Sequence, residues 1–431
     1  MRATQNLPEG YAPHDTESLP HYLAGIDSLR QKLGGDPATW RVEEVGDGNL
    51  NLVFKVRGPD AGVAVKQALP YVRLVGESWP LPLSRAHFEH LALSVEAHHA
   101  PGLVPAILHY DETLALIVME LLEPHIILRQ GMIAGTVYPR FVEDITDFTA
   151  RTLFFTSDLA LSAADKKELV GAFAGNSALC KITEDLIFTE PYTIAENNRW
   201  TGPQLDPYAA RLREDGDLKV AISRLKLRFM GDAQALIHGD LHTGSVMVTE
   251  DDTRVIDPEF AFMGPMGFDL GALVANLLIN YFSQDGHEKT AGERDTYRAW
   301  VLETLEGVWS GFQEKFLALW RSEAAAGDGY PAALFQGPLG AARLEQERKA
   351  YMNRLYRDTL GFGAAKMIRR IVGLAHNIDL EWIEDPARRA RCEARALTLA
   401  RELMVNPASF PAIGDVSQAA AELRRWEPPL G

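Results

Sequence analysis

The order of secondary-structure patterns along the chain limits the folds that it can adopt. Short β-type segments bounded by glycine and proline turns are concentrated in the first third, and the apolar run at residues 114–122 is typical of a buried strand. Beyond this run, apolar residues recur mostly with helical spacing. Strands followed by a long helical segment favour an α+β fold. We therefore expect a bilobal α+β architecture, with a small β-rich N-terminal lobe over residues 1–122 and a large helical C-terminal lobe over residues 123–431.

The expected elements can be placed by residue number. Strands are expected at residues 40–45, 50–56 and 63–67, and Ser84 would cap a helix at 85–97. The N-terminal lobe is thus expected to hold an antiparallel sheet and one helix, preceded by a helical extension. The helices expected in the second lobe cover residues 141–161, 165–173, 206–230, 295–321, 341–356, 362–378 and 385–404.

Composition restricts the classes of partner. The 431 residues include 46% hydrophobic and 24% charged residues, as in ordinary globular proteins. The formal net charge of −16 disfavours nucleic acid and anionic membranes as partners, since both require a basic surface. Two cysteines cannot build a disulfide framework, and the N-terminal segment lacks the pattern of a signal peptide. No apolar run reaches the roughly 18 residues of a membrane helix, so we expect a cytoplasmic protein.

Two aspartates, Asp240 and Asp257, stand seventeen positions apart, each on a turn beside an apolar run. Phosphoryl transfer requires one carboxylate that orients the attacking hydroxyl and accepts its proton, and another that holds the magnesium ion bridging the ATP phosphates. Asp240, in His-Gly-Asp, is the candidate base, whereas Asp257 and Glu259 offer oxygen ligands to Mg²⁺. An aspartate beside glycine or proline is also common in ordinary turns. Together, in these settings, the carboxylates predict a kinase.

Glycines in the first lobe suit a phosphate-binding turn. Gly46 and Gly48 would lie at a hairpin tip, where backbone N–H groups can cover phosphates, and Asn49 can add a side-chain hydrogen bond. Asn51 stands where protein kinases have a third glycine. A simple hairpin also requires glycine, so this signal is weak by itself.

Lys66 lies on the third expected strand, where a kinase needs a lysine that pairs with the α- and β-phosphates and with a glutamate of the next helix. Glu89 is the best candidate for this glutamate, ahead of Glu77 and Glu96. A lone strand lysine is more often solvated, but the downstream carboxylates favour the catalytic interpretation.

The apolar run ends at Glu120, Leu121 and Leu122, just before Pro124. A two-lobed kinase places its hinge here, and the main chain of the hinge hydrogen-bonds adenine. An ordinary strand end fits the same residues nearly as well.

The pattern His-Gly-Asp-x(4)-Ser followed by Asp-x-Glu differs from the His-Arg-Asp-x(4)-Asn and Asp-Phe-Gly of protein kinases. It resembles the small-molecule kinases of the aminoglycoside phosphotransferase and choline kinase type. The longer runs GDGNLNLVFKV, HGDLHTGSVMV, DPEFAFMGPMGFDLG and KMIRRIVGLAH are similar to the 5-methylthioribose kinases of methionine salvage. The resemblance implies a protein-kinase-like fold, ATP and Mg²⁺, a homodimer, and transfer to the 1-hydroxyl of 5-methylthioribose.

The resemblance also implies roles for single residues. Asp240 would contact the sugar and act as the base, and Asp269 would brace the catalytic loop from a buried position. Ser245 stands where other relatives have a magnesium-binding asparagine, so Asp257 and Glu259 are expected to hold the metal. The residues expected at the ATP site are Gly46, Gly48, Asn49, Lys66, Glu89, Glu120, Leu121, Leu122, Asp257, Pro258 and Glu259.

Arg369 and Arg370 lie on the helix expected at 362–378. In the resembled family this element reaches the substrate pocket, where a guanidinium can hold sugar hydroxyls and offset charge on the transferring phosphoryl group. Arg369, Gly373 and His376 would share one helical stripe, with Gly373 allowing close approach and His376 a satisfied interior histidine. A basic surface pair is the alternative.

Two other functions stay open. Another small-molecule kinase, acting on an aminoglycoside, choline or a homoserine-like alcohol, would share the same motifs, although the arginine pair suits a neutral sugar better than a cationic substrate. A nucleotide-binding pseudokinase is disfavoured because Lys66, Asp240 and Asp257 are all present.

Overall fold

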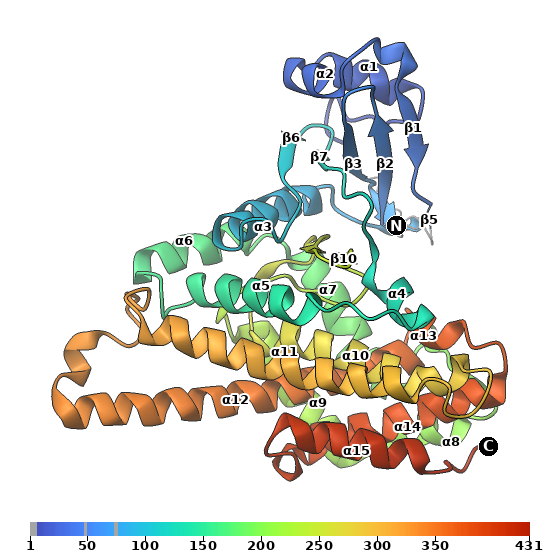
Figure 1. Cartoon of the computed structure of the whole chain (residues 1–431), viewed down its shortest axis with the longest axis vertical. Helices are drawn as coiled ribbons and strands as arrows, with labels where there is room; N and C mark the ends of the chain where they lie inside the picture. Colours follow the sequence, from blue (N-terminus) through green and yellow to red (C-terminus); the bar gives the residue numbers. More distant parts are fainter. Residues whose placement is uncertain (1–6, 47–49, 73–75) are drawn as a thin grey trace.

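The protein has two lobes of very different size (Figure 1). The structure, a computed structural model, describes residues 7–46, 50–72 and 76–431. The small lobe has a five-stranded sheet in the order β1-β2-β3-β7-β6, with antiparallel neighbours throughout. Its strands are β1 (Arg41–Glu44), β2 (Asn51–Arg57), β3 (Gly62–Ala68), β6 (Ile107–Asp111) and β7 (Leu116–Glu120). The expected two-lobed α+β architecture is confirmed.

Successive side chains of β3 point to opposite faces of the sheet. Val63 and Val65 are buried on one face, where helices α1 (Ser18–Ala24) and α2 (Asp27–Leu33) cover the sheet. Lys66 therefore points to the opposite face, where α3 (Arg85–His99) packs. A further hairpin joins β4 (Tyr71–Val72) and β5 (Gly76–Pro80) ahead of α3.

Short strands of the large lobe hold the segment that carries the two aspartates. Asp240 lies between β9 and β10, and Asp257 lies between β11 and β12. Because β9 pairs with β12, and β10 pairs with both β8 and β11, the two connecting segments leave neighbouring strands. These strands are β8 (Ile126–Ile127), β9 (Ala235–Ile237), β10 (Val246–Val248), β11 (Thr253–Val255) and β12 (Phe262–Gly264).

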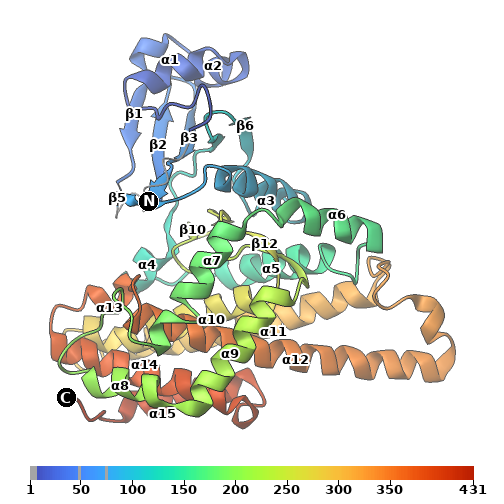
Figure 2. The ribbon, with the colours of Figure 1, turned by 180° about the vertical axis from the view of Figure 1, so that it is seen from behind.

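The rest of the large lobe is helical, and Figure 2 shows α7 and α9 on the face opposite to that of Figure 1. Helices α11 and α12 are long and extend to one end of the molecule in both views. The helices are α4 (Leu128–Ala134), α5 (Phe141–Phe155), α6 (Ala163–Phe173), α7 (Ser177–Leu186), α8 (Asp206–Glu214), α9 (Gly216–Gly231), α10 (Gly267–His287), α11 (Asp295–Arg321), α12 (Gly337–Val372), α13 (Ile378–Glu381), α14 (Pro386–Val405) and α15 (Ile413–Arg425).

The single helix expected at 206–230 is wrong, because α8 and α9 replace it. Asp215 has extended backbone angles, and its side chain accepts a hydrogen bond from the backbone N–H of Leu218. This hydrogen bond caps the first turn of α9 and so stabilises a separate helix that starts after Asp215. The chain therefore forms two helices here and not one continuous helix.

The two helices expected at 341–356 and 362–378 are one helix, α12, which ends at Val372. Gly361 and Gly363 lie inside it, since packing overrides their low helical propensity. The stripe expected to extend to His376 is therefore absent, because the chain has left the helix before that residue. His376 instead lies 2.9 Å from the carbonyl oxygen of Arg199.

Helix α10 is the centre of the large lobe and packs against α11, α12 and α14. Taken from Met266 to His287, it is long and apolar enough to cross a membrane, with a mean hydropathy of 1.2, but its most apolar window is entirely buried within the protein. A core helix that is surrounded by other helices has the same apolar composition on all sides.

Glycines allow α10 and α12 to approach closely. A Cβ atom on Gly271 would lie 2.6 Å from the backbone nitrogen of Gly363 and 2.7 Å from the carbonyl oxygen of Thr359. Both neighbours are backbone atoms of a regular helix, so they cannot rotate away as a side-chain end would. The spacing of the two helices therefore depends on Gly271.

We expect Gly271→Ala to lower the free energy of unfolding by about 1–3 kcal/mol, because the added methyl group must push α12 away from α10. Urea unfolding followed by circular dichroism measures this change. Gly171→Ala is the matched control, since Gly171 is an exposed glycine within α6 whose Cβ would meet no atom within 4 Å. The control should be stabilised by about 0.5–1 kcal/mol; equal stability of Gly271→Ala and the parent would contradict the packing argument.

Candidate active site

Lys66 joins three distant segments of the chain. Its Nζ lies 2.8 Å from Oε1 of Glu89 on α3 and also contacts Oδ1 of Asp257 after β11. Burial lowers the pKa of Lys66, but Asp257 and Glu89 together raise it above the ordinary value. The lysine is thus held as a cation, and Glu89 is the glutamate that meets it.

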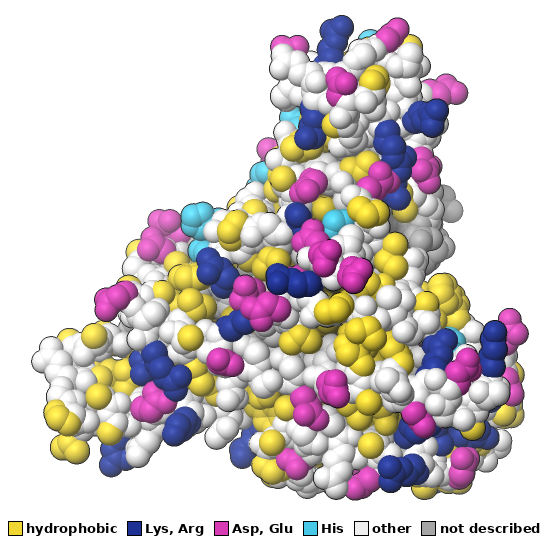
Figure 3. Space-filling model, viewed as in Figure 1, with side chains coloured by type: hydrophobic (Ala, Val, Ile, Leu, Met, Phe, Trp, Pro, Cys, Tyr) yellow, Lys and Arg dark blue, Asp and Glu magenta, His cyan; other side chains and the backbone are white. Residues whose placement is uncertain are grey.

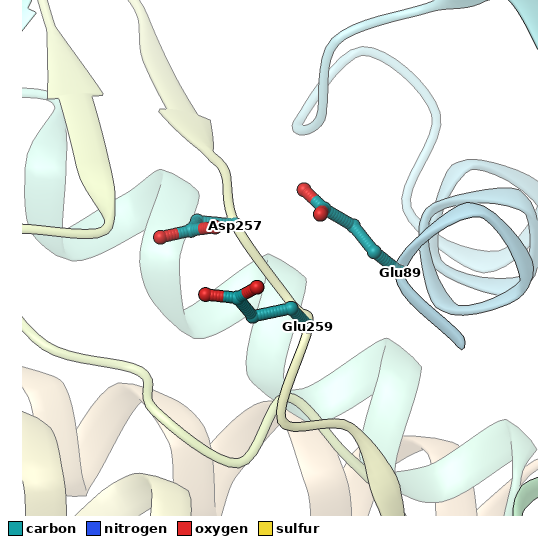
Figure 4. A group of neighbouring side chains, drawn as sticks. All are labelled: Glu89, Asp257 and Glu259. Atoms are coloured by element: carbon teal, nitrogen blue, oxygen red, sulfur yellow. The ribbon is translucent and has the colours of Figure 1, made fainter. Parts of the chain in front are cut away.

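Three carboxylates gather beside this lysine (Figure 4). Asp257 and Glu259 leave the segment after β11 and Glu89 extends from α3; one oxygen of each lies within 4.8 Å of the others. Burial raises the pKa of Glu89 to about 8 and also raises the pKa of Glu259. Carboxylate oxygens are the ligands that Mg²⁺ prefers, and a divalent cation would offset the repulsion among them. The residues present therefore fit a magnesium ion.

Arg85 and Asn51 hold Glu259 in place, and the sequence did not predict either contact. Asn51 donates a hydrogen bond to Oε2 of Glu259 at 3.0 Å, and Nε of Arg85 lies 3.4 Å from the same oxygen. Arg85 also donates to the carbonyl oxygen of Leu50 and to the side chain of Asn51, at the start of β2. An arginine among the apolar positions of α3 was the available signal, because a buried guanidinium requires acceptors.

The His-Gly-Asp segment has a backbone geometry that explains its glycine. Gly239 has φ of +83°, and a Cβ there would lie 2.2 Å from the carbonyl oxygen of Phe260. Asp269, at the start of α10, accepts hydrogen bonds from the backbone N–H groups of His238 at 2.7 Å and Gly239 at 3.0 Å. The expectation that Asp269 braces this loop is confirmed.

Ser245 shapes the same loop. Its hydroxyl accepts a hydrogen bond from the backbone N–H of His242 at 2.9 Å and donates to the carbonyl oxygen of Asp240 at 2.8 Å. The side chain is buried. These contacts close a tight turn directly after Asp240.

Asp240 is paired with two side chains that the sequence did not predict. Oδ1 lies 2.9 Å from Nζ of Lys366 on α12, and Oδ2 lies 3.2 Å from Nε2 of His242. Burial raises the pKa of Asp240, but Lys366, His242 and Arg370 hold it well below its usual range. Asp240 is therefore an anion whose side chain is still one-quarter exposed and can meet a ligand.

Arg369 and Arg370 follow Lys366 at the end of α12. Burial, together with the neighbouring Arg370, lowers the pKa of Arg369 to about 9. Among the described residues, Nε and Nη1 of Arg369 and Nε of Arg370 are buried without a hydrogen-bond partner. Buried donors without partners are rare, so these groups suit a polar ligand at Asp240.

Arg129, another residue that the sequence did not predict, adds a third guanidinium from α4. It donates to Oγ1 of Thr243 at 3.1 Å and to Oδ1 of Asn276 at 3.0 Å, and it lies 3.5 Å from Asp379. Arg129 thereby links α4 to the loop after Asp240.

The structure describes most of the remaining predicted residues. Glu120 ends β7, and Leu121 and Leu122 follow it into the connection between the lobes. Gly46 faces open space beyond β1, while Gly48 and Asn49 lie outside the described residues. Pro258 is buried between Asp257 and Glu259, where its carbonyl oxygen accepts a hydrogen bond from Ala261.

The chain is similar to several known proteins. The ethanolamine kinase of Plasmodium vivax aligns with a TM-score of 0.45 and 14% identity, over 90% of this chain and 89% of its own. The chain is 47% identical to methylthioribose kinase 1 of Oryza sativa subsp. japonica over 410 residues, which cover 95% of each protein. It is 46% identical to the methylthioribose kinase of Escherichia coli O45:K1 over 418 residues, 97% of this chain and 99% of that relative.

The model of the phosphotransferase enzyme family matches residues 41–308. This match confirms the protein-kinase-like, bilobal fold implied by the resemblance. The chain belongs to the phosphotransferase enzyme family and, within it, to the methylthioribose kinases.

Proposed function

We propose that this protein transfers the γ-phosphoryl group of ATP to the 1-hydroxyl of 5-methylthioribose, giving ADP and 5-methylthioribose 1-phosphate in methionine salvage. The observation that carries the proposal is that two carboxylate groups are each paired with a different lysine. Asp240 is paired with Lys366, and Asp257 is paired with Lys66. Phosphoryl transfer requires this separation of a base from a metal-holding group. The near-complete coverage of the methylthioribose kinases supports the choice of sugar.

ATP would lie between the lobes. Lys66 would pair with its α- and β-phosphates, and the main chain of Glu120, Leu121 and Leu122 would hold adenine. Gly46, Gly48 and Asn49 would cover the phosphates, and Pro258 would lie beside them. Asp257 and Glu259 would hold Mg²⁺, which supplies positive charge that offsets the phosphate oxygens. Asn51 and Arg85 both contact Oε2 of Glu259, and they would keep this carboxylate directed toward the ion.

Asp240 would orient the sugar and accept its proton. As the 1-hydroxyl loses its proton to Asp240, the sugar oxygen bonds to the γ-phosphorus and the bond to the bridging oxygen of ADP breaks. The unpartnered donors of Arg369 and Arg370 would hold the sugar hydroxyls and the negative charge on the transferring group.

The wider organisation is also part of the proposal. Residues 1–122 and 123–431 would form the two lobes, and the protein would act as a cytoplasmic homodimer without a nucleic-acid or membrane partner. The net charge of −16 supports the absence of those partners. On the face drawn in Figure 3, lysine and arginine side chains are interspersed with acidic ones instead of forming a basic patch. The homodimer rests on the family resemblance, and analytical ultracentrifugation measures it directly.

An ADP-release assay across methylthioribose, choline, homoserine and an aminoglycoside tests the activity. We expect ADP only with methylthioribose, and we expect Asp240→Asn to lower kcat by roughly 10²–10⁴-fold, the usual contribution of a positioned general base. Calorimetry should show that Asp240→Asn still binds ATP. ADP release with another acceptor but not with methylthioribose would overturn the proposal. Full activity of Asp240→Asn would overturn it as well.

Asp257→Ala should weaken binding of Mg·ATP and raise the magnesium concentration needed for half-maximal rate, because a metal ligand is lost. Titration of the rate with Mg²⁺ at fixed ATP measures this. Asp251→Ala is the control, since Asp251 is an exposed aspartate of the nearby β10–β11 turn. An unchanged magnesium dependence in Asp257→Ala would contradict its assignment as a ligand.

Arg369→Ala and Arg370→Ala should each raise the KM for the sugar by roughly 10-fold or more, while the KM for ATP changes less, since a charged hydrogen bond contributes about 1.5–3 kcal/mol. Initial rates with either substrate varied separate the two constants. Arg357→Ala, an exposed arginine of the same helix, serves as the control. Equal increases for both substrates would refute the assignment to the sugar.

A further inference from the structure

Lys366 is held in one orientation by groups on two sides. Its Nζ lies 2.9 Å from Oδ1 of Asp240 and 4.3 Å from the ring centre of Phe268. The lysine side chain is only 3% exposed. Phe268 lies directly before Asp269, the residue that braces the loop carrying Asp240. The cation is therefore fixed relative to that loop by an aromatic face and a carboxylate.

His242 supplies the second contact to Asp240, and its tautomer follows from its neighbours. The backbone N–H of Gly244 donates to Nδ1 of His242 at 2.9 Å, so Nδ1 carries no proton. Burial lowers the pKa of His242 to about 3, and the ring is neutral near pH 7. Its single proton is therefore on Nε2, which donates to Oδ2 of Asp240 at 3.2 Å.

Asp240 thus accepts one hydrogen bond on each oxygen, and cations face it from several elements. Each carboxylate oxygen has two lone pairs, so room for the acceptor hydroxyl remains. The charged and titratable groups around Asp240 are Lys366, Arg369 and Arg370 from α12, Arg129 from α4, and His238 and His242 from its own loop.

Such strong stabilisation of the anion makes Asp240 a weak base, because a proton must compete with these partners. A weak base accepts a proton more readily from an acidic hydroxyl than from the hydroxyl of an ordinary alcohol. The 1-hydroxyl of a reducing sugar is acidic for an alcohol, since its carbon carries a second oxygen. The contacts of Asp240 therefore match a hemiacetal hydroxyl.

We propose that Lys366 is a positioning residue that, with His242, keeps Asp240 ionised and directed at a hemiacetal hydroxyl, and so restricts the acceptors to reducing sugars. This inference rests on the proposed function, because it takes Asp240 as the base. In the step, the hydroxyl proton passes to Asp240, the sugar oxygen bonds to the γ-phosphorus and the bond to ADP breaks. Lys366 remains protonated and changes no bond.

The test compares the pH dependence of kcat/KM for methylthioribose in the wild type, Lys366→Met and Lys366→Arg. A carboxylate with a lowered pKa stays active as the pH falls, until the pH passes through that pKa. Without the cation, the pKa of Asp240 rises, so the acid limb of Lys366→Met should move to higher pH. Its kcat/KM at the optimum should fall by roughly 10–100-fold, the loss expected for one charge-assisted hydrogen bond. Lys366→Arg should keep the wild-type limb.

Lys166→Met separates this effect from the loss of a buried lysine. Lys166 is a buried residue of α6 that contacts Asp158 and the carbonyl oxygens of Thr156 and Gln234. This variant should keep the wild-type pH profile even if its stability falls. Coincident acid limbs for wild type and Lys366→Met would overturn the role of Lys366. A wild type inactive on methylthioribose would instead refute the proposed function itself.

Discussion

The close contact between α10 and α12 is the constraint on which the active site depends. Gly271 has no side chain at the point where the backbone of α12 passes, so the two helices lie nearer than larger residues would permit. The start of α10 carries Asp269, which fixes the loop of Asp240, and α12 carries Lys366, which pairs with Asp240. One helix pair therefore sets the position of the carboxylate and of its cation.

Charged side chains that meet across the junction of the lobes form the second constraint. Lys66 and Glu89 come from the small lobe and Asp257 from the large one, while Arg85 reaches Glu259 across the same junction. Removing one partner of a buried pair such as Arg85 and Glu259 costs about 3–5 kcal/mol, because the other charge stays buried without compensation. These contacts bring Lys66, Glu89, Asp257 and Glu259 together and also hold the two lobes in one arrangement.

Local patterns predicted the two lobes, most strands of the small-lobe sheet and the gathering of Lys66, Glu89, Asp257 and Glu259. They failed where packing acts over distance. Helical spacing could not show that α12 continues through Gly361 and Gly363, since glycine weakens a helix locally. Gly361 packs against Leu225 of α9 and Gly363 against α10, and only these tertiary contacts explain the continuation. The break at Asp215 is the opposite case, because one side chain capped a new helix within a helical pattern.

Two kinds of information are therefore separable in this protein. The sequence by itself determined the chemistry of the site, because the His-Gly-Asp and Asp-x-Glu motifs contain its carboxylates and its glycine. Short strands and tight turns fix the positions of residues that lie this close together in the chain. Only the tertiary structure decided what surrounds Asp240. Lys366 lies 126 positions away from Asp240 in the chain. Local sequence patterns cannot predict which lysine will meet a given aspartate, because that pairing depends on how distant helices pack. That choice depends on the closeness of α10 and α12, which glycines at their contact, Gly271 among them, permit.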